Sequence, residues 1–252
     1  FKTLQGDCSQ VPFEEIQEIL HIEFPGRLDL IFESIEEKPL AAASIAQVHR
    51  AKLVNGKEVV IKVLRPGIRQ RVEEDMALME TLAMFMEQYF SDLGYSPTAV
   101  AKEFSREILK EVNLIYEGQA TDKLRKYFED DPNIFFPEVF WQSTTRNVLT
   151  LQEIKGKVLS SLSPQQLTPS ERRAIVAHGT DAVFKQCLRF GFFHADPHPG
   201  NIFLQPDNTI CFIDCGMTGQ LDRKTTEQLI TLVAGVLKGD IDKICRVVIQ
   251  LT

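Results

Sequence analysis

The chain has 252 residues, enough for a sizeable core in one large domain or in two lobes. With 44% apolar and 25% charged residues, its composition is that of an ordinary soluble globular protein. The net charge of -7 argues against a general nucleic-acid-binding surface, so no nucleic-acid partner is expected. The longest apolar runs are too short to span a bilayer, and no signal peptide is visible.

The cysteines follow no regular spacing and are odd in number, which favours a reducing compartment over a disulfide framework. They are Cys8, Cys187, Cys211, Cys215 and Cys245. We interpret Cys211 and Cys215 as core thiols, because zinc sites usually show a second pair of ligands. The chain opens at Phe1 and stops within a helical pattern, so we expect a piece of a longer protein.

The N-terminal part predicts a helix, a linker and then a run of small residues. The helix begins near Pro12, carries Ile16 and Leu20 at helical spacing, and ends before Pro25-Gly26. The linker is expected over residues 32–38. The small residues lie between two predicted strands, where backbone N–H groups could cradle phosphates, or where the chain makes only a tightly packed turn. They are Ala41, Ala42, Ala43 and Ser44.

The β-branched run from Val59 to Leu64 predicts a buried strand that contains Lys62. A buried ammonium needs a carboxylate or phosphate partner, although strands often carry a lysine on their wet face. One of three downstream glutamates could reach it: Glu107, Glu111 or Glu117.

Two long helices follow this strand. The first carries an apolar stripe rich in methionine over residues 68–86, which we interpret as core packing. Ser96 is expected to cap the second helix, with Pro97 in its first turn. The predicted buried face of that helix consists of Val100, Phe104, Ile108, Val112 and Ile115.

Further elements lead into a polar loop. Strands are predicted over residues 132–142 and 147–154. A capping box of Thr168 and Glu171 starts a helix that Gly191 ends. After the loop, residues 202–213 predict a hairpin, and the tail from Lys224 onward predicts a helix.

The strongest chemical signal is the loop His194-Ala195-Asp196-Pro197-His198-Pro199-Gly200-Asn201, followed by Asp214-Cys215-Gly216. An aspartate such as Asp196 can accept a hydroxyl proton or orient a nucleophile. Asn201 and Asp214, which the hairpin brings to one end, can hold the magnesium that bridges nucleotide phosphates. A small-residue loop, strand lysine, helix glutamate, Asp–Asn loop and final Asp-x-Gly follow the order expected of a protein kinase fold.

The segment from Pro39 to His49, the strand with Lys62 and the polar loop together resemble the UbiB-type atypical kinases, also called aarF-domain kinases. The resemblance covers essentially the whole chain. It implies an α+β, protein-kinase-like bilobal fold in which alanine replaces the glycines of the phosphate loop. A β-rich N-lobe with inserted helices would occupy residues 1–154. A truncated helical C-lobe would occupy residues 155–252.

The resemblance also implies roles for single residues. Lys62 would contact phosphates and pair with Glu117, Asp196 would be the catalytic aspartate, and Asn201 and Asp214 would bind metal. Adenine would meet the backbone of the hinge, and phosphates would meet the alanine loop. Those nucleotide-binding residues are Ala41, Ala42, Ala43, Ser44, Gln152, Glu153 and Ile154. Glu111 matches the family's Glu-x-Asp motif, in which Asn113 replaces the aspartate.

Members of this family bind ATP or ADP with Mg²⁺ and support the biosynthesis of ubiquinone or related prenyl lipids. The implied partners are adenine nucleotide and lipids or proteins of quinone biosynthesis. The implied location is the bacterial cytoplasm at the inner membrane, or the mitochondrial or plastid interior, with membrane-peripheral attachment. His198 departs from the lysine that protein kinases usually carry two residues after the catalytic aspartate, which weakens the case for transfer to a protein hydroxyl.

Three alternatives remain open at this point. A small-molecule kinase of the aminoglycoside or choline type carries a similar polar loop, although the alanine loop favours the UbiB-type interpretation. A non-catalytic pseudokinase that senses nucleotide would retain the same residues. A metal hydrolase using His194, Asp196 and His198 is disfavoured, because the two prolines between and after them preclude a helix that aligns the histidines.

Overall fold

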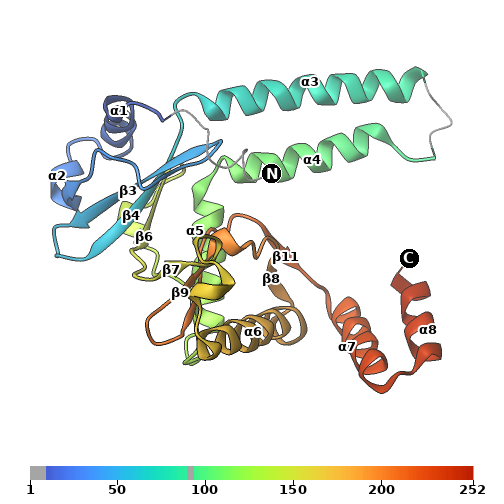
Figure 1. The fold of residues 1–252 in the computed structure, drawn as a ribbon. Coiled ribbons are helices and arrows are strands. Elements are labelled where there is room, and N and C mark those ends of the chain that lie inside the picture. The colour runs from blue at the N-terminus through green and yellow to red at the C-terminus, as the bar shows by residue number, and fades with distance from the viewer. Residues whose placement is uncertain (1–9, 90–93, 252) are drawn as a thin grey trace. The chain divides into compact units, whose positions relative to one another are not determined.

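The computed structural model describes residues 10–89 and 94–251, so Cys8 lies outside the described residues. The chain combines helices with mainly antiparallel sheets, which confirms the expected α+β class (Figure 1). It divides into two compact units, one of residues 1–119 and 138–153 and the other of residues 120–137 and 154–252. The sequence-based division into 1–154 and 155–252 stays a prediction.

The first unit is built around a five-stranded antiparallel sheet with the order β1-β3-β4-β6, in which β2 pairs with β3. Its strands are β1 (Phe32–Ile35), β2 (Ala41–Ala42), β3 (Ala46–Leu53), β4 (Glu58–Leu64) and β6 (Val148–Gln152). The strand predicted around Lys62 is confirmed. The predicted linker over residues 32–38 is wrong, because residues 32–35 pair with β3.

Strand β4 separates two apolar clusters by the alternation of its side chains. Val59, Ile61 and Val63 are fully buried in a cluster with Ile16 and Leu20 of helix α1 (Phe13–Glu23). The opposite side chains of β4 belong to a second cluster that includes Leu114 and Leu149. Lys62 therefore lies on the second face of the sheet, away from α1.

The remaining helices of this unit are α2 (Leu28–Ile31), α3 (Ile68–Tyr89), α4 (Pro97–Glu111) and the first part of α5 (Leu114–Tyr127). Helices α3 and α4 run antiparallel and pack against each other (Figure 1). The predicted cap is confirmed, since the Ser96 hydroxyl accepts a hydrogen bond from the Ala99 N–H at 3.1 Å.

The predicted buried face of α4 is only partly right: Val112 is buried and Ile108 and Ile115 are half-buried, but the other two members are not. Val100 and Phe104 are 58% and 50% exposed, whereas Ala101 and Ser105 are buried. The one buried residue that α3 contributes among its described residues is also small, Ala83. Two helices that approach closely need small side chains between them, which places the larger apolar residues outside. The core interpretation of the methionine stripe holds only in part, because Met86 is 42% exposed.

The second unit contains a four-stranded sheet with the order β5-β10-β9-β7 and a two-stranded sheet of β8 and β11. The strands are β5 (Ile134–Phe135), β7 (Lys157–Val158), β8 (Phe192–His194), β9 (Ile202–Leu204), β10 (Ile210–Phe212) and β11 (Thr218–Gln220). The long strand predicted over residues 132–142 is wrong, because in this range only residues 134 and 135 form a strand. Val139 makes an isolated bridge to Leu151, and residues 141–143 form the 3₁₀ helix η1.

Helices of the second unit are α6 (Pro169–Phe184), the π-helical η4 (Lys185–Phe190), α7 (Arg223–Lys238) and α8 (Ile241–Leu251), with short 3₁₀ turns η2 (Leu159–Ser161), η3 (Pro164–Gln166) and η5 (Pro199–Asn201). The capping box of Thr168 and Glu171 is confirmed. Gly191 ends the helical segment in a left-handed conformation, as predicted.

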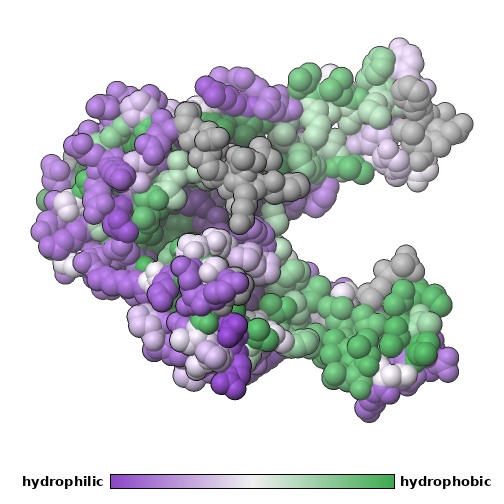
Figure 2. Space-filling view, in the orientation of Figure 1, coloured by the Kyte–Doolittle hydropathy of each residue, from purple (hydrophilic) through white to green (hydrophobic). Residues whose placement is uncertain are grey.

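Apolar side chains gather on the surface of α7 and α8 (Figure 2). Across the described residues, no helix is both long and apolar enough to cross a membrane.

The Gln47 and His49 side chains form a buried network on β3 that bonds Val11, just before α1, to the sheet. Both are fully buried on β3. The Gln47 amide bonds both backbone groups of Val11 at 3.0 and 3.2 Å. The His49 Nδ1–H donates to the Glu36 carbonyl at 2.8 Å, so Nε2 accepts from the Gln47 Nε2–H at 2.9 Å. These bonds require a neutral imidazole with its proton on Nδ1.

Burial of the ring lowers the pKa of His49 below its ordinary value, and the Glu36 hydrogen bond only partly offsets this effect. The unfolded chain therefore binds a proton at a higher pH than the folded chain. We predict that the free energy of unfolding falls as the pH drops from about 7 through about 6.5, the usual histidine pKa, and continues to fall below it.

Urea unfolding at several pH values tests this prediction. A His49→Gln variant should show a flatter dependence between about pH 7 and pH 5.5. A His21→Gln variant serves as the control, since His21 is exposed. Equal slopes in wild type and His49→Gln would contradict the prediction.

Candidate functional site

In the first unit, Lys62 and Glu117 form a buried ion pair. The Lys62 Nζ donates to both Glu117 carboxylate oxygens, at 2.9 and 2.8 Å. The two side chains are only 16% and 7% exposed. The structure thus brings together the strand lysine and the helix glutamate that the sequence paired, while their catalytic role stays a prediction.

Glu117 reaches Lys62 because the chain starts a new helix shortly before it. Helix α4 ends at Glu111, and the Asn113 Oδ1 accepts a hydrogen bond from the Ile115 N–H at 3.3 Å. Asn113 thereby caps the start of α5, and Glu117 lies in its first turn. A short polar side chain at position 113 thus serves the helix that carries Glu117, a role that sequence reasoning missed.

The alanine loop is a tight turn between β2 and β3, closed by the Ala43 N–H bonded to the Ala46 carbonyl at 2.8 Å. Arg65, the residue after β4, holds this turn: its backbone N–H donates to the Ile45 carbonyl and its Nε to the Ala43 carbonyl, each at 2.9 Å. Within the described part of the chain, the N–H groups of Ser44 and Ile45 have no partner. These are the two loop amides left to meet a phosphate.

The residues expected to meet adenine lie at the end of β6, where the chain passes from the first unit to the second. The Gln152 N–H donates to the Glu138 carbonyl and the Glu153 N–H to the Glu58 carbonyl. Glu153 also pairs with Arg50 at 2.8 Å. Among the described residues, the Ile154 N–H has no partner, which makes it the donor available to a base.

In the second unit, the hairpin of β9 and β10 places Asn201 beside Asp214, as predicted. Phe212 pairs with Ile202, and the Ile213 N–H donates to the Asn201 carbonyl at 2.9 Å. The Asn201 Nδ2 donates to the Asp196 carbonyl at 3.3 Å, so the amide oxygen of Asn201 is left for another contact. The three predicted residues Asp196, Asn201 and Asp214 therefore lie on adjoining loops.

His194 joins those loops. The Asp196 N–H donates to its Nδ1 at 3.1 Å, so the ring proton is on Nε2, which donates to the Ile213 carbonyl at 3.1 Å. His194 therefore has a structural role, because it bonds backbone groups on both sides of the two loops. The buried Gln186 was missed: its Oε1 accepts the His194 N–H at 2.7 Å from the π-helical turn η4. A π-helical turn next to a functional loop is a known association that the sequence does not reveal.

His198 is exposed, and its Nδ1 accepts the Gly200 N–H at 3.0 Å. Both ring nitrogens of His194 are already bonded to backbone, so a metal bound there would have to break those contacts. Among the described residues, no group of three His, Cys, Asp or Glu side chains is arranged to hold a metal ion. The geometry therefore gives the metal hydrolase alternative no support.

Asp214 has a left-handed backbone, with φ of 53°. This conformation is uncommon for a residue other than glycine and marks a strained position. Cys211 and Cys215 on either side of it are fully buried, and burial raises the pKa of the Cys211 thiol. Both are core thiols, as interpreted from the sequence.

The antiparallel sheet with a lysine–glutamate pair, together with the Asp–Asn loop and the Asp-x-Gly turn, defines a kinase-like α+β protein. The family model described as "ABC1 atypical kinase-like domain" matches residues 3–248. The chain belongs to this family, and the resemblance to UbiB-type kinases is confirmed.

Two relatives and one solved structure show the range of similarity. "Probable protein kinase UbiB" of Aliivibrio fischeri is 33% identical, over 96% of this chain and 46% of that protein. "Protein ACTIVITY OF BC1 COMPLEX KINASE 7, chloroplastic" of Arabidopsis thaliana is 31% identical, over 94% of this chain and 34% of that protein. The chain thus spans half or less of the length of these curated relatives. The erythromycin complex of Rv3197 from Mycobacterium tuberculosis has a TM-score of 0.83 at 23% identity, covering 98% of this chain and 62% of that one.

We predict strong energetic coupling between Lys62 and Glu117. Glu117→Leu removes the Glu117 carboxylate from the Lys62 ammonium and should lower the free energy of unfolding by about 3–5 kcal/mol. Lys62→Met should have a similar effect. The double variant should lose less than the two single losses combined, with a coupling of at least about 1 kcal/mol in urea unfolding.

The exposed pair of Lys52 and Glu33, whose charged groups lie 2.8 Å apart, provides the control. Glu33→Gln should lower the free energy of unfolding by less than about 1 kcal/mol. Additive losses at Lys62 and Glu117 would argue against the coupling.

We predict that His194→Leu lowers the free energy of unfolding by about 1–3 kcal/mol, because the Asp196 N–H and the Ile213 carbonyl lose their shared partner. Chemical denaturation of the variant measures this loss. His198→Leu, in the same loop but exposed, should cost less than about 1 kcal/mol, since water replaces its single backbone contact. An unchanged stability of His194→Leu would disprove the joining role.

Proposed function

We propose that this chain is the nucleotide-binding core of an atypical kinase, which binds ATP or ADP with Mg²⁺ and catalyses phosphotransfer or ATP hydrolysis. The observation that carries the proposal is the cluster of Asp196, Asn201 and Asp214, held together by one hairpin and by His194. The Lys62–Glu117 pair supports it, since this pair must be in place in protein kinases.

The residues of the second unit fit a magnesium ion by their chemistry. Asn201 offers an amide oxygen and Asp214 a carboxylate, and hard oxygen ligands are what Mg²⁺ prefers. When bound, the ion would neutralise charge on the phosphates. Lys62 would bind the α- and β-phosphates, and Glu117 would hold the lysine in position. The alanine loop would offer the N–H groups of Ser44 and Ile45.

Asp196 is the group proposed to orient or deprotonate the attacking nucleophile. Its backbone is fixed on both sides, by His194 at the N–H and by Asn201 at the carbonyl. Its side chain is exposed, and within the described part of the structure the carboxylate has no partner. A carboxylate positioned in this way can accept a proton from a hydroxyl group or from water.

We propose water as the main acceptor of the phosphoryl group, because His198 stands where protein kinases usually carry a lysine. Its Nδ1 accepts the Gly200 N–H, so the ring is neutral and offers a single Nε2–H donor. A lysine at this position would supply a full positive charge to the transferring phosphoryl group. Hydrolysis is therefore favoured over transfer to a protein hydroxyl.

The wider role proposed is support of ubiquinone or related prenyl-lipid biosynthesis, with lipids or biosynthetic proteins as partners and a membrane-peripheral location. The family resemblance is its support, together with relatives named for UbiB and for a chloroplastic kinase. Those relatives are longer than this chain, and their full-length activities are assigned to it only as part of the proposal.

We predict that ATP or ADP with Mg²⁺ raises the thermal unfolding midpoint by about 5–10 °C at 100 times the dissociation constant. Asp214→Asn should lose the magnesium-dependent part of the shift, because it removes a charged oxygen ligand. Glu227→Gln, a matched charge change on α7, should retain the full shift. Thermal shift assays with and without Mg²⁺ make the measurement, and the absence of any nucleotide-dependent shift in the wild type would overturn the proposal.

The same variants separate catalysis from nucleotide sensing. Asp196→Asn should retain the thermal shift and lose about 10²–10⁴-fold in turnover, the range expected for loss of a general base. If the wild type binds nucleotide but its turnover equals that of Asp196→Asn, the non-catalytic alternative is correct. A screen of small alcohols as phosphoryl acceptors tests the small-molecule kinase alternative.

A further inference from the structure

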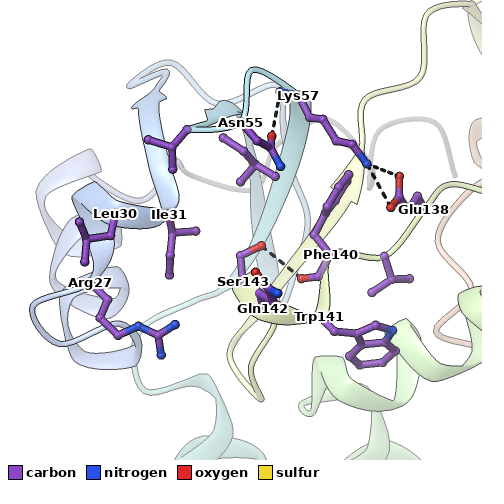
Figure 3. Close-up of a pocket in the computed structure, with 13 residues that line it drawn as sticks. Arg27, Leu30, Ile31, Asn55, Lys57, Glu138, Phe140, Trp141, Gln142 and Ser143 are labelled. Atoms are coloured by element: carbon purple, nitrogen blue, oxygen red, sulfur yellow. Dashed lines mark hydrogen bonds and ion pairs between the residues drawn. The ribbon is translucent and has the colours of Figure 1, made fainter.

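The first unit contains a cavity of about 720 Å³ that none of the proposed nucleotide contacts uses. Its lining comes from three segments: the region of α2, the turn between β3 and β4, and the strip of residues 138–143 (Figure 3). The volume falls within the range of about 300–1,000 Å³ typical of small-molecule sites.

The walls of the cavity are fixed by hydrogen bonds and packing. In the strip, the Phe140 N–H donates to the Thr150 carbonyl and the Thr150 hydroxyl to the Ser143 carbonyl, at 2.9 and 2.6 Å. A Cβ on Gly118 of α5 would lie 3.1 Å from the Trp141 ring, so the indole packs tightly against that helix. The cavity is therefore preformed, as ligand sites usually are.

Apolar side chains of the lining remain open to solvent. Leu30 is 72% exposed, Val54 56% and Trp141 42%. The indole also offers a flat face on which a second ring can stack. A group of exposed apolar side chains around one cavity is a feature of binding sites.

Of the two positively charged side chains that line the cavity, one is paired with a carboxylate and the other is not. The Lys57 Nζ bonds both Glu138 carboxylate oxygens, at 3.2 and 2.9 Å, and lies 4.8 Å from the centre of the Phe140 ring. Arg27, by contrast, has no carboxylate partner among the described residues. Figure 3 shows Arg27 on one side of the cavity and Trp141 on the other, with Gln142 between them. A guanidinium and a carboxylate match each other in a two-pronged hydrogen bond.

We propose that this cavity binds a small aromatic carboxylate, with its ring against Trp141 and its carboxylate on Arg27. Gln142 also lines the cavity, and its amide is an additional donor. Leu30 and Val54 would cover the outer edge of the ring. The site is distinct from the proposed nucleotide contacts, and binding there does not depend on the proposed function.

The test uses the fact that Trp141 is the only tryptophan of the chain. A ¹⁵N-labelled chain therefore shows one indole N–H cross-peak, which reports directly on the cavity. Titration with 2-naphthoate should move this peak in a saturable manner, with a dissociation constant on the order of 0.1–1 mM. Its neutral analogue 2-naphthamide should bind about tenfold more weakly, or worse.

Two variants locate the ligand. Arg27→Gln should weaken 2-naphthoate binding by about tenfold or more. Val54→Glu, which adds a negative charge at an exposed position of the lining, should do the same. Arg69→Gln is the control, because Arg69 pairs with Glu73 outside this cavity. Thermal unfolding shows that each variant is folded.

Two results would overturn the proposal. One is an indole peak that does not move up to 10 mM of 2-naphthoate, a concentration about tenfold above the weakest expected dissociation constant. The other is a titration that is the same for wild type and for the folded Arg27→Gln and Val54→Glu variants. Equal binding of 2-naphthamide would disprove recognition of the carboxylate.

Discussion

The buried ion pair of Lys62 and Glu117 is the constraint on which the first unit depends. A charge enclosed by protein must be paired, so the two charged groups have to meet. The alternation of β4 sets the side of the sheet on which Lys62 lies, and the end of α4 with the cap at Asn113 places Glu117 beside it. A change of one residue in the register of β4 would turn Lys62 toward α1 and leave Glu117 without this lysine. The same register of β4 that buries the apolar residues therefore also places Lys62 where the proposed phosphate binding needs it.

Those parts of the fold that local rules control could be predicted from the sequence. The strand around Lys62, the caps at Ser96 and Thr168 and the stop at Gly191 follow from side-chain type and spacing alone. The predictions failed where tertiary contacts decide. Residues 32–35 were predicted as a linker, since they form a strand only through pairing with β3. Val100 of α4 was predicted to be buried, but the buried positions of that helix hold small residues.

The candidate site shows the same division. The residues with distinctive chemistry, Lys62, Asp196, Asn201 and Asp214, could be identified from their order along the chain. The residues that position the site could not, because Asn113, Gln186 and the Arg65 side chain at the alanine loop each act through a side-chain hydrogen bond to backbone that no spacing reveals. His49 is the clearest case: it belongs to the segment from Pro39 to His49 that carries part of the family resemblance, yet it serves a buried network next to the first helix.

The backbone of Asp214 favours one residue type and the proposed chemistry another, because a left-handed conformation suits glycine while magnesium binding needs a carboxylate. Glycine would adopt this conformation without strain, and an aspartate there is less stable by on the order of 1 kcal/mol. Exchange of Asp214 for glycine would relieve this strain, but it would remove in the same step the contacts of the aspartate and the carboxylate oxygens of the proposed magnesium site. Selection for a relaxed backbone and selection for the proposed chemistry therefore act on the same residue in opposite directions.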